Sequence, residues 1–275
     1  MPLYLYAFPG EQVLKQAVVG AEFAFRREKM PEREASIVLS RINHCFGDTQ
    51  VLSDINLTVP PGLIFGLLGP SGCGKTTTVK IMAGILEASS GMVQVLGERM
   101  PKLSLMNRLG YMAQSDALYT NLTAEENLSF FGSLYGMDKK RTGERIREVM
   151  ALVNLTGDGK KIVAAYSGGM KRRLSLAMAL LHEPEILILD EPTVGIDPVL
   201  RKIIWDALVT MAELGMTIIV TTHVMDEAEK CHELAMMREG RVIALDTPSQ
   251  LKENTGASSL EEAFIRYGSG ERHED

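Results

Sequence analysis

One short segment, Gly69–Thr76, limits the possible folds of this chain more than any other part of the sequence. It reads GPSGCGKT and fits the pattern GxxxxGK[ST] in full. The apolar run Leu63–Leu68 precedes it and a helical pattern over Lys75–Leu86 follows it, which predicts a loop between a buried strand and a helix. Glycines let such a loop wrap closely around phosphate, and the helix N-terminus adds positive potential. The segment therefore predicts a nucleoside-triphosphate site.

The side chains of this loop fit the same ligand. Lys75 can reach the β- and γ-phosphates, and the hydroxyl of Thr76 can bind Mg²⁺. A thiol at Cys73, beside Lys75 and a helix N-terminus, is expected to have a pKa below its ordinary value. The alternative is an unreactive thiol that fills space beneath the loop. We assign nucleotide contacts to the loop and the residue that follows it: Gly69, Pro70, Ser71, Gly72, Cys73, Gly74, Lys75, Thr76 and Thr77.

Two carboxylates follow a second buried run. Asp190 and Glu191 end the segment LILDE, and Pro192 comes next. The first carboxylate stands where a Mg²⁺ ligand is needed beside a phosphate loop. The second lies one residue beyond, on the other side of the backbone, where it can polarise an attacking water as a general base. The pair therefore predicts hydrolysis of the bound triphosphate.

Alternation of short apolar runs and helical patterns indicates an α/β fold with a parallel or mixed sheet. The sequence between Lys75 and Asp190 is longer than a minimal phosphate-loop domain needs, and its mostly helical excess, about 115–182, is interpreted as an inserted helical subdomain. A turn at Glu239-Gly240 predicts a hairpin. The expected strands are Ile37–Phe46, Val51–Val59, Leu63–Leu68, Ile186–Leu189 and Met216–Thr221; the expected helices are Lys75–Leu86, Thr123–Tyr135, a segment around Leu174–Leu181, and Pro198–Leu214.

Composition narrows the class of partner. The chain has 275 residues and a net charge of −6. Proteins that bind nucleic acid usually present a stripe of basic side chains, so an acidic chain is a poor candidate for that function. Three separated cysteines, Cys45, Cys73 and Cys231, indicate neither a disulfide framework nor a zinc site, and fit a reducing cytosol. No apolar run is long enough to cross a bilayer, and we identify no secretion signal. We expect the chain not to span a membrane by itself, although it could act at one through a partner.

The region 1–35 differs from the rest of the chain. Leu14, Val18, Ala21 and Phe25 recur at helical spacing, and Pro31 ends the pattern. We interpret it as an N-terminal extension that forms a helix packed on its own domain, or an arm. The alternative is an amphipathic docking helix for a membrane surface or a partner.

A second anion site is predicted within the helical insertion. Ser167-Gly168-Gly169 precedes a helical pattern, so Ser167 can cap the helix while the glycines leave N–H groups open to an anion. One chain is not expected to bring this site and the distant phosphate loop to one nucleotide. Two chains arranged head to tail by two-fold symmetry could do so. The adjacent Lys171-Arg172-Arg173 run is interpreted as the solvated side of the helix.

The ordered set of motifs resembles the ATP-binding subunit of ATP-binding-cassette (ABC) transporters over residues 36–250. This set comprises Gly69–Thr76, Gln114, Ser167–Gly169, Asp190-Glu191 and His223. The resemblance implies a P-loop NTPase with a recombinase-like core, an N-terminal antiparallel β subdomain and a helical subdomain that contains the signature motif. Residues 251–275 then form a C-terminal tail.

The resemblance also implies roles for single residues. Phe46 would stack on adenine in place of the more usual tyrosine. Gln114 would reach Mg²⁺ and the attacking water and would sense the membrane partner. His223 would contact the γ-phosphate beside the general base Glu191, and Asp190 would join Thr76 at the metal.

Three further positions are compared with the family pattern. Gly195-Ile-Asp197-Pro matches the loop that communicates across the dimer. Tyr166 replaces a leucine and Met170 replaces a glutamine in the signature motif. The Ser-Gly-Gly contact to ATP is retained, so the departures affect only the hydrogen bonds that the glutamine would make.

A narrower likeness, to the ATPases of drug and polysaccharide exporters with a separate membrane subunit, depends on the segment SGGMKRRLSLAMALL and on Ser259–Phe264. We therefore expect an ATP hydrolase that uses ATP and Mg²⁺ at the cytoplasmic face of the cell membrane, as a peripheral protein. Its expected partners are an integral membrane permease subunit and a second copy of itself or a related ATPase subunit, with no nucleic acid. The alternative is a non-transport ABC ATPase that acts on nucleic acid or the ribosome. A simple kinase or switch would not need the Ser-Gly-Gly motif.

Overall fold

The computed structural model describes residues 35–115 and 117–269, so nearly all of the predicted N-terminal extension lies outside the described residues. Contacts divide the described chain into two compact units. Residues 35–115, 184–192 and 215–269 form what we name the sheet unit, and residues 117–183 and 193–214 form the helical unit. Each unit is described by itself. Within the described ranges, every helix is too short or too polar to span a bilayer.

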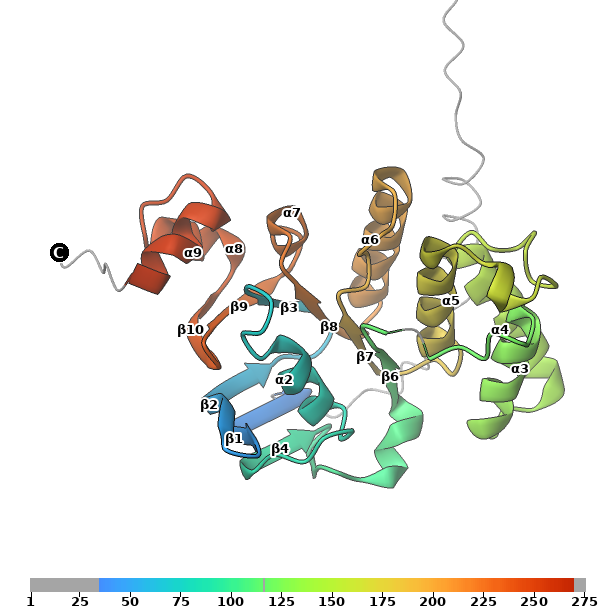
Figure 1. Ribbon diagram of the computed structural model, residues 1–275, viewed down its shortest axis with the longest axis horizontal. Coiled ribbons are helices and arrows are strands. Elements are labelled where there is room, and N and C mark those ends of the chain that lie inside the picture. The colour runs from blue at the N-terminus through green and yellow to red at the C-terminus, as the bar shows by residue number, and fades with distance from the viewer. Residues whose placement is uncertain (1–34, 116, 270–275) are drawn as a thin grey trace, which may run out of the picture. The chain divides into compact units, whose positions relative to one another are not determined.

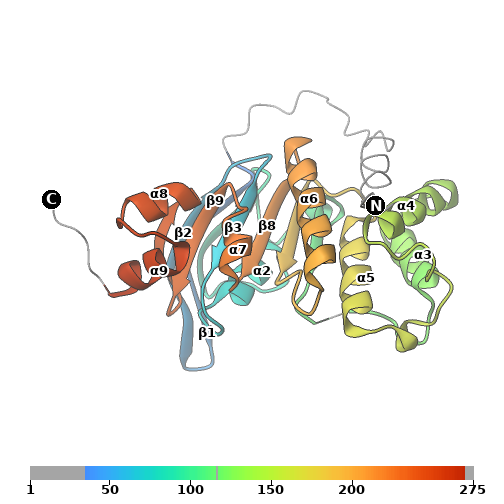
Figure 2. The same cartoon turned by 90° about the horizontal axis from the view of Figure 1, so that it is seen from above.

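The sheet unit contains two sheets (Figures 1 and 2). The first is antiparallel, with strand order β2-β1-β4-β5. The second has the order β10-β9-β3-β8-β7-β6 and is parallel except for β10, which pairs with β9 as an antiparallel edge strand. The strands are β1 (Ile37–Phe46), β2 (Thr49–Val59), β3 (Ile64–Leu68), β4 (Ser90–Val95), β5 (Glu98–Arg99), β6 (Leu109–Met112), β7 (Ile186–Asp190), β8 (Thr217–Thr222), β9 (Glu233–Arg238) and β10 (Arg241–Asp246). This arrangement confirms the predicted α/β class with an antiparallel β subdomain.

Helix α2 (Lys75–Met82) contacts strands of both sheets, and the apolar core of the unit surrounds it. Strands β3, β7 and β8 are buried along their whole length, as their uninterrupted apolar sequences predict. The remaining elements are a 3₁₀ segment, η1 (Leu103–Arg108), and the helices α7 (Met225–Ala228), α8 (Pro248–Glu253) and α9 (Leu260–Ser269). Helices α8 and α9 lie beside β10 (Figure 1).

Backbone geometry explains where helix α2 ends and confirms the predicted hairpin. Helix α2 ends at Met82, short of the predicted Leu86, because Gly84 adopts a φ of 70° and Ile85 N donates to Lys80 O at 2.9 Å. This is a glycine C-cap of the Schellman type. The predicted hairpin is confirmed, since both turn residues between β9 and β10 have positive φ, as a two-residue type I′ turn requires.

The helical unit is built from α3 (Ala124–Leu134), α4 (Lys139–Leu152) and α5 (Gly168–Leu180), which contact one another, with a 3₁₀ segment, η2 (Val163–Ala165), and α6 (Pro198–Glu213) (Figure 2). Arg145 of α4 is buried, and it donates to Leu180 O at 2.8 Å and to Leu181 O at 3.1 Å. These bonds satisfy carbonyls at the C-terminal end of α5. The unit includes residues 193–214, beyond the inserted segment expected at about 115–182, and the proposed domain boundaries stay a prediction.

Candidate functional site

The phosphate-loop segment connects β3 to α2, as the sequence predicts. Gly74 precedes the helix with a φ of 104°, in the left-handed region, so glycine suits this position. Lys75 is the first residue of α2 and is buried, and its Nζ donates to the carbonyl oxygens of Gly69 at 2.7 Å and Pro70 at 3.0 Å. These bonds hold the ammonium group beside the loop at the N-terminus of the helix. The charge of the ammonium and the partial positive charge of the helix N-terminus both favour binding of an anion there.

The loop is packed against the β9–β10 hairpin. A Cβ atom at Gly69 would lie 2.3 Å from Met237 O, so no larger residue fits there. The turn residue Gly240 donates its N–H to Cys73 O at 3.1 Å, and its own carbonyl accepts from Ser53 N at 2.8 Å. The β9–β10 hairpin therefore packs against the phosphate loop and bonds its backbone at Cys73. Sequence analysis identified the hairpin but not this contact.

Parallel strand pairing brings the other predicted catalytic and metal-binding residues of the sheet unit to one edge of the parallel sheet. In the register of β6, β7 and β8, Met112 pairs with Leu189, and Asp190 pairs with Thr221. Gln114 comes two residues after the end of β6, and His223 comes directly after the end of β8. Because carboxyl ends of parallel strands share one edge, these side chains meet there.

Asp190 is fully buried at the end of β7 and accepts two hydroxyl hydrogen bonds on Oδ1. Thr76 Oγ1 donates at 3.2 Å, and Thr221 Oγ1 donates at 2.6 Å. The first contact unites the predicted metal residues of the loop and of β7. A hydroxyl and a carboxylate beside a phosphate-binding helix are hard oxygen donors of the kind that Mg²⁺ prefers. Thr221 was not singled out by sequence analysis, although its place at the end of a buried run was a usable signal.

Glu191 lies between two predicted catalytic partners. Its Oε1 is 3.2 Å from His223 Nδ1, and its Oε2 accepts from Gln114 Nε2 at 3.3 Å. An ionised carboxylate only accepts, so Nδ1 must hold the proton in this contact. The imidazole and the amide thus orient the carboxylate, each through a different oxygen atom.

The other nucleotide-contact residues lie at exposed or helical positions. Phe46 is exposed at the end of β1 and makes an edge contact with His44, with ring centroids 4.6 Å apart. Its aromatic ring is accessible, as stacking on a base would require. Pro70, Ser71 and Gly72 are exposed in the loop, and Thr77 is partly buried in α2.

Ser167, Gly168 and Gly169 belong to the helical unit, at the start of α5. Ser167 is the N-cap, and its hydroxyl accepts from Met170 N at 3.3 Å, as the sequence predicts. The interpretation of the neighbouring basic run as a solvated face is wrong. Arg172 is buried, and Arg173 is partly buried and donates to the carbonyls of the α4 C-terminus, Val153 at 3.0 Å and Asn154 at 2.8 Å. These guanidinium contacts fix helix ends rather than face a partner.

The expectation of a lowered pKa at Cys73 is also wrong. Burial raises the pKa of this thiol above its ordinary value, and the opposing effects of the Lys75 charge and of backbone hydrogen bonds do not compensate. Its Sγ would lie 2.7 Å from a Cβ atom at Gly69, beneath the loop backbone. The geometry favours the alternative, an unreactive thiol that fills space.

Maleimide labelling is therefore expected to modify Cys45 in the native protein and to spare Cys73 and Cys231, because Cys45 is exposed and the other two thiols are buried. A Cys45→Ser variant should take up almost no reagent until it is denatured. Mass spectrometry of the digested, labelled protein gives the readout, and a Cys73→Ser variant is the control. Native labelling of Cys73 at a rate comparable to that of Cys45 would contradict this assignment.

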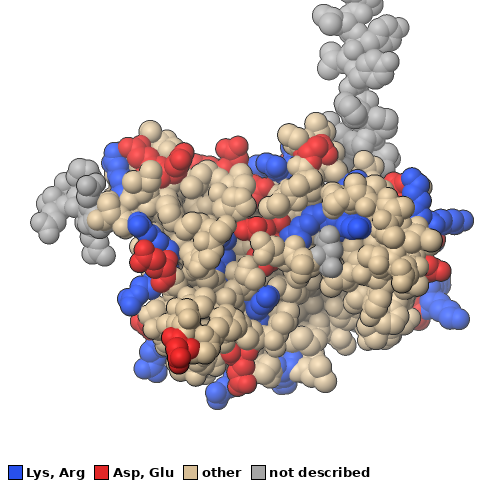
Figure 3. Space-filling model, in the orientation of Figure 1, with Lys and Arg blue, Asp and Glu red and all other residues tan. Residues whose placement is uncertain are grey.

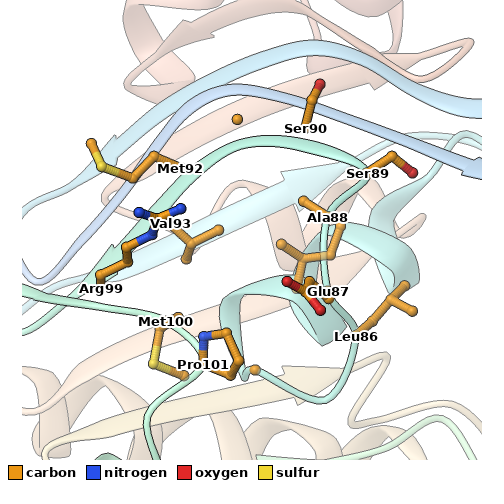
Figure 4. Close-up of a pocket in the computed structure, with 13 residues that line it drawn as sticks. Leu86, Glu87, Ala88, Ser89, Ser90, Met92, Val93, Arg99, Met100 and Pro101 are labelled. Carbon is orange, nitrogen blue, oxygen red and sulfur yellow. The ribbon is translucent and has the colours of Figure 1, made fainter.

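A separate cavity of about 270 Å³ opens in the sheet unit, beside the end of α2 and the strands β4 and β5 (Figure 4). Ile81, Val93 and Met100 supply apolar walls, and Glu87 and Arg99 supply the charged side chains. Its lining includes none of the residues assigned to nucleotide or metal. The candidate chemistry therefore lies at the edge of the parallel sheet and not in this cavity.

Comparison with the sequences of known proteins adds three findings. The family model for ABC transporters matches residues 52–194. The probable multidrug ABC transporter ATP-binding protein YbhF of Escherichia coli (strain K12) is 41% identical over 240 residues, which is 85% of this chain and 42% of that protein. The Nod factor export ATP-binding protein I of Paraburkholderia xenovorans (strain LB400) is 40% identical over 221 residues, which is 79% of this chain and 73% of that protein.

A solved structure agrees with the fold. The structure of an ATP-binding subunit of an ABC transporter superposes with a TM-score of 0.79 at 26% identity, covering 85% of this chain and all of that one. The chain thus spans less than half of the first relative and most of the second.

Proposed function

The chain belongs to the ABC transporter family of ATP-binding proteins, and from this we propose that it is the ATP-hydrolysing motor subunit of an exporter with a separate transmembrane subunit. The observation that supports hydrolysis most directly is the cluster at the sheet edge. There Glu191 is held between Gln114 and His223, next to Asp190 and Thr76. The phosphate loop supplies Lys75 at the N-terminus of α2.

The loop residues Gly69–Thr77 would bind the phosphates of ATP, and Phe46 would stack on adenine. Thr76, Asp190 and Gln114 would hold Mg²⁺, which neutralises charge on the β- and γ-phosphates when bound. The Lys75 ammonium would exchange its bonds to loop carbonyls for charge-assisted bonds to phosphate oxygens. Those carbonyl bonds keep the ammonium near the place where phosphate is needed.

Glu191 would act as the general base in this reaction. A water bound to its carboxylate gives up a proton to it, while the water oxygen bonds to the γ-phosphorus. The bond from that phosphorus to the bridging oxygen of ADP breaks, so ADP and inorganic phosphate leave. His223 and Gln114 orient the carboxylate for this transfer, and His223 would also contact the γ-phosphate.

A second copy of the chain, or a related ATPase subunit, would complete each site. The N-terminus of α5 presents the Ser167–Gly169 backbone N–H groups, a suitable contact for the γ-phosphate of a nucleotide bound to the partner. Gly195-Ile-Asp197-Pro would form the loop that communicates across this dimer. The helical segment at about 115–182 would be the subdomain that contains the signature motif.

The transport proposal is favoured over action on nucleic acid. The two relatives named above are multidrug and Nod factor export ATP-binding proteins, which supports export through an integral membrane permease and a peripheral position at the cytoplasmic face of the membrane. Acidic and basic side chains of the described residues are interspersed on the face shown in Figure 3. The net charge of −6 agrees with this reading.

Purification from detergent-solubilised native membranes tests this proposal. We expect the tagged full chain to retain an integral membrane protein through size exclusion and to release phosphate from ATP only when Mg²⁺ is added. The ultraviolet absorbance of the purified complex, measured before ATP is added, should be that of protein without nucleic acid. A particle that contains RNA or DNA and lacks a membrane protein would instead support the non-transport alternative.

A further inference from the structure

The backbone at Glu191 adopts a conformation that a residue with a side chain seldom takes. Its φ is +50°, in the left-handed region, where Cβ crowds the following carbonyl. Such a conformation persists only where surrounding contacts fix it, and it is concentrated at functional sites. The contacts that fix the Glu191 peptide therefore help to determine the orientation of its side chain, the proposed general base.

Thr221 of the neighbouring strand β8 supplies two of these contacts. The N–H of Glu191 donates to Thr221 Oγ1 at 2.9 Å, with Thr221 O also within 3.2 Å. The same hydroxyl donates its proton to Asp190 Oδ1 at 2.6 Å. A hydroxyl has one proton and two lone pairs, so it makes both bonds at once.

The position of Thr221 in the sheet explains this double role. It pairs with Asp190 in the register of β7 and with Leu67 of β3 on its other side. Thr221 and Asp190 are both fully buried, and a hydrogen bond to a buried charge is stronger than one in water. Thr221 thus lies on the strand between β3, which leads into the phosphate loop, and β7, which leads into the two carboxylates.

We propose that Thr221 is a positioning residue for ATP hydrolysis, which sets the strained turn at Glu191 and the orientation of the Asp190 carboxylate through a single hydroxyl. The inference rests on the proposed function, because it assigns those two carboxylates to the reaction. Thr221 touches neither water nor phosphate in this role. It acts through the residues on β7.

Thr221→Val keeps the shape of the side chain and removes the hydroxyl. The carbonyl of residue 221 can still accept from Glu191 N, and Thr76 still donates to Asp190, so the site is loosened and not dismantled. We expect kcat to fall by about tenfold to a hundredfold, the range for loss of a hydrogen bond to a charged group. The affinity for ATP without metal should stay within about twofold, because the loop and Lys75 make those contacts.

A second readout does not depend on turnover. Binding of a fluorescent ATP analogue is measured with and without Mg²⁺, and the tightening caused by Mg²⁺ should be several-fold smaller in Thr221→Val than in the wild type. Thr221→Ser restores the hydroxyl and should recover most of both readouts. Thr217→Val is the matched control, since Thr217 is also buried on β8 but bonds Ser36 Oγ at 2.9 Å and Gly62 N at 3.0 Å at the other end of the strand.

The outcomes separate this inference from the proposed function. A wild-type chain that never hydrolyses ATP, alone or with its membrane partner, overturns both. Normal hydrolysis by the wild type and a valine variant within twofold of it overturns the role of Thr221 alone. An equal loss in Thr217→Val, or no recovery in Thr221→Ser, also overturns it by showing a general packing effect. Thermal melting confirms that each variant is folded, and Thr221→Ala replaces the valine variant if that one does not fold.

Discussion

Replacing Glu191 with glutamine is expected to lower ATP turnover by about 10²–10⁴-fold, the usual contribution of a positioned general base, while ATP binding is retained. The amide has nearly the same shape as the carboxylate but cannot accept a proton from water. Gln114 Nε2 can still donate to the amide oxygen, so the side chain keeps its place at the sheet edge. The expected trapped species is a dimer with ATP bound.

Phosphate release and size exclusion with ATP measure the two parts of this result. Glu213→Gln, an exposed position on α6, serves as the matched control and should behave as the wild type. A Glu191→Gln variant that turns over ATP at close to the wild-type rate would show that another group takes the proton. A variant that loses ATP binding as well would show that the carboxylate contributes to the binding of ATP rather than to its hydrolysis.

The fold was predictable where the sequence contains uninterrupted apolar runs and turn residues. The strands β3, β7 and β8 and the hairpin at Glu239-Gly240 lie where their patterns predict, within a residue or two. The short strand β6 and the helix α4 were not predicted. A strand of four residues has too few positions to show a pattern, and the sequence of α4 is rich in charged residues, so its apolar face is narrow.

The site was predictable in its residue types but not in the contacts between them. The sequence identifies Asp190, Glu191 and His223 by their places after buried strands. It does not show that Thr221 bonds Asp190, because register between strands that are distant in sequence is a tertiary property. Cys73 was misjudged for a related reason: proximity to Lys75 is visible in the sequence, whereas burial, the larger effect on its pKa, is not.

Two inactive variants are expected to restore activity when they form a mixed dimer. Lys75→Ala removes a charge-assisted contact to phosphate, and Ser167→Arg replaces the N-cap of α5 with a bulky cation at the proposed γ-phosphate contact. Each variant alone should show only background hydrolysis, since every site in its homodimer has the same lesion. In a head-to-tail mixed dimer, one site has both lesions and the other has neither.

Differently tagged chains allow the mixed dimer to be isolated by two affinity steps. It should hydrolyse ATP at about half the wild-type rate per dimer, because one of two equivalent sites is intact. The matched control pairs Ser167→Arg with the double variant Lys75→Ala/Ser167→Arg, a dimer in which neither site is intact, and it should stay at background. If each chain instead completed its own site, the first mixed dimer would have a lesion in both sites and would be as inactive as the control. Equal background activity in the two mixed dimers would therefore rule out the trans arrangement, or show that one intact site cannot work alone.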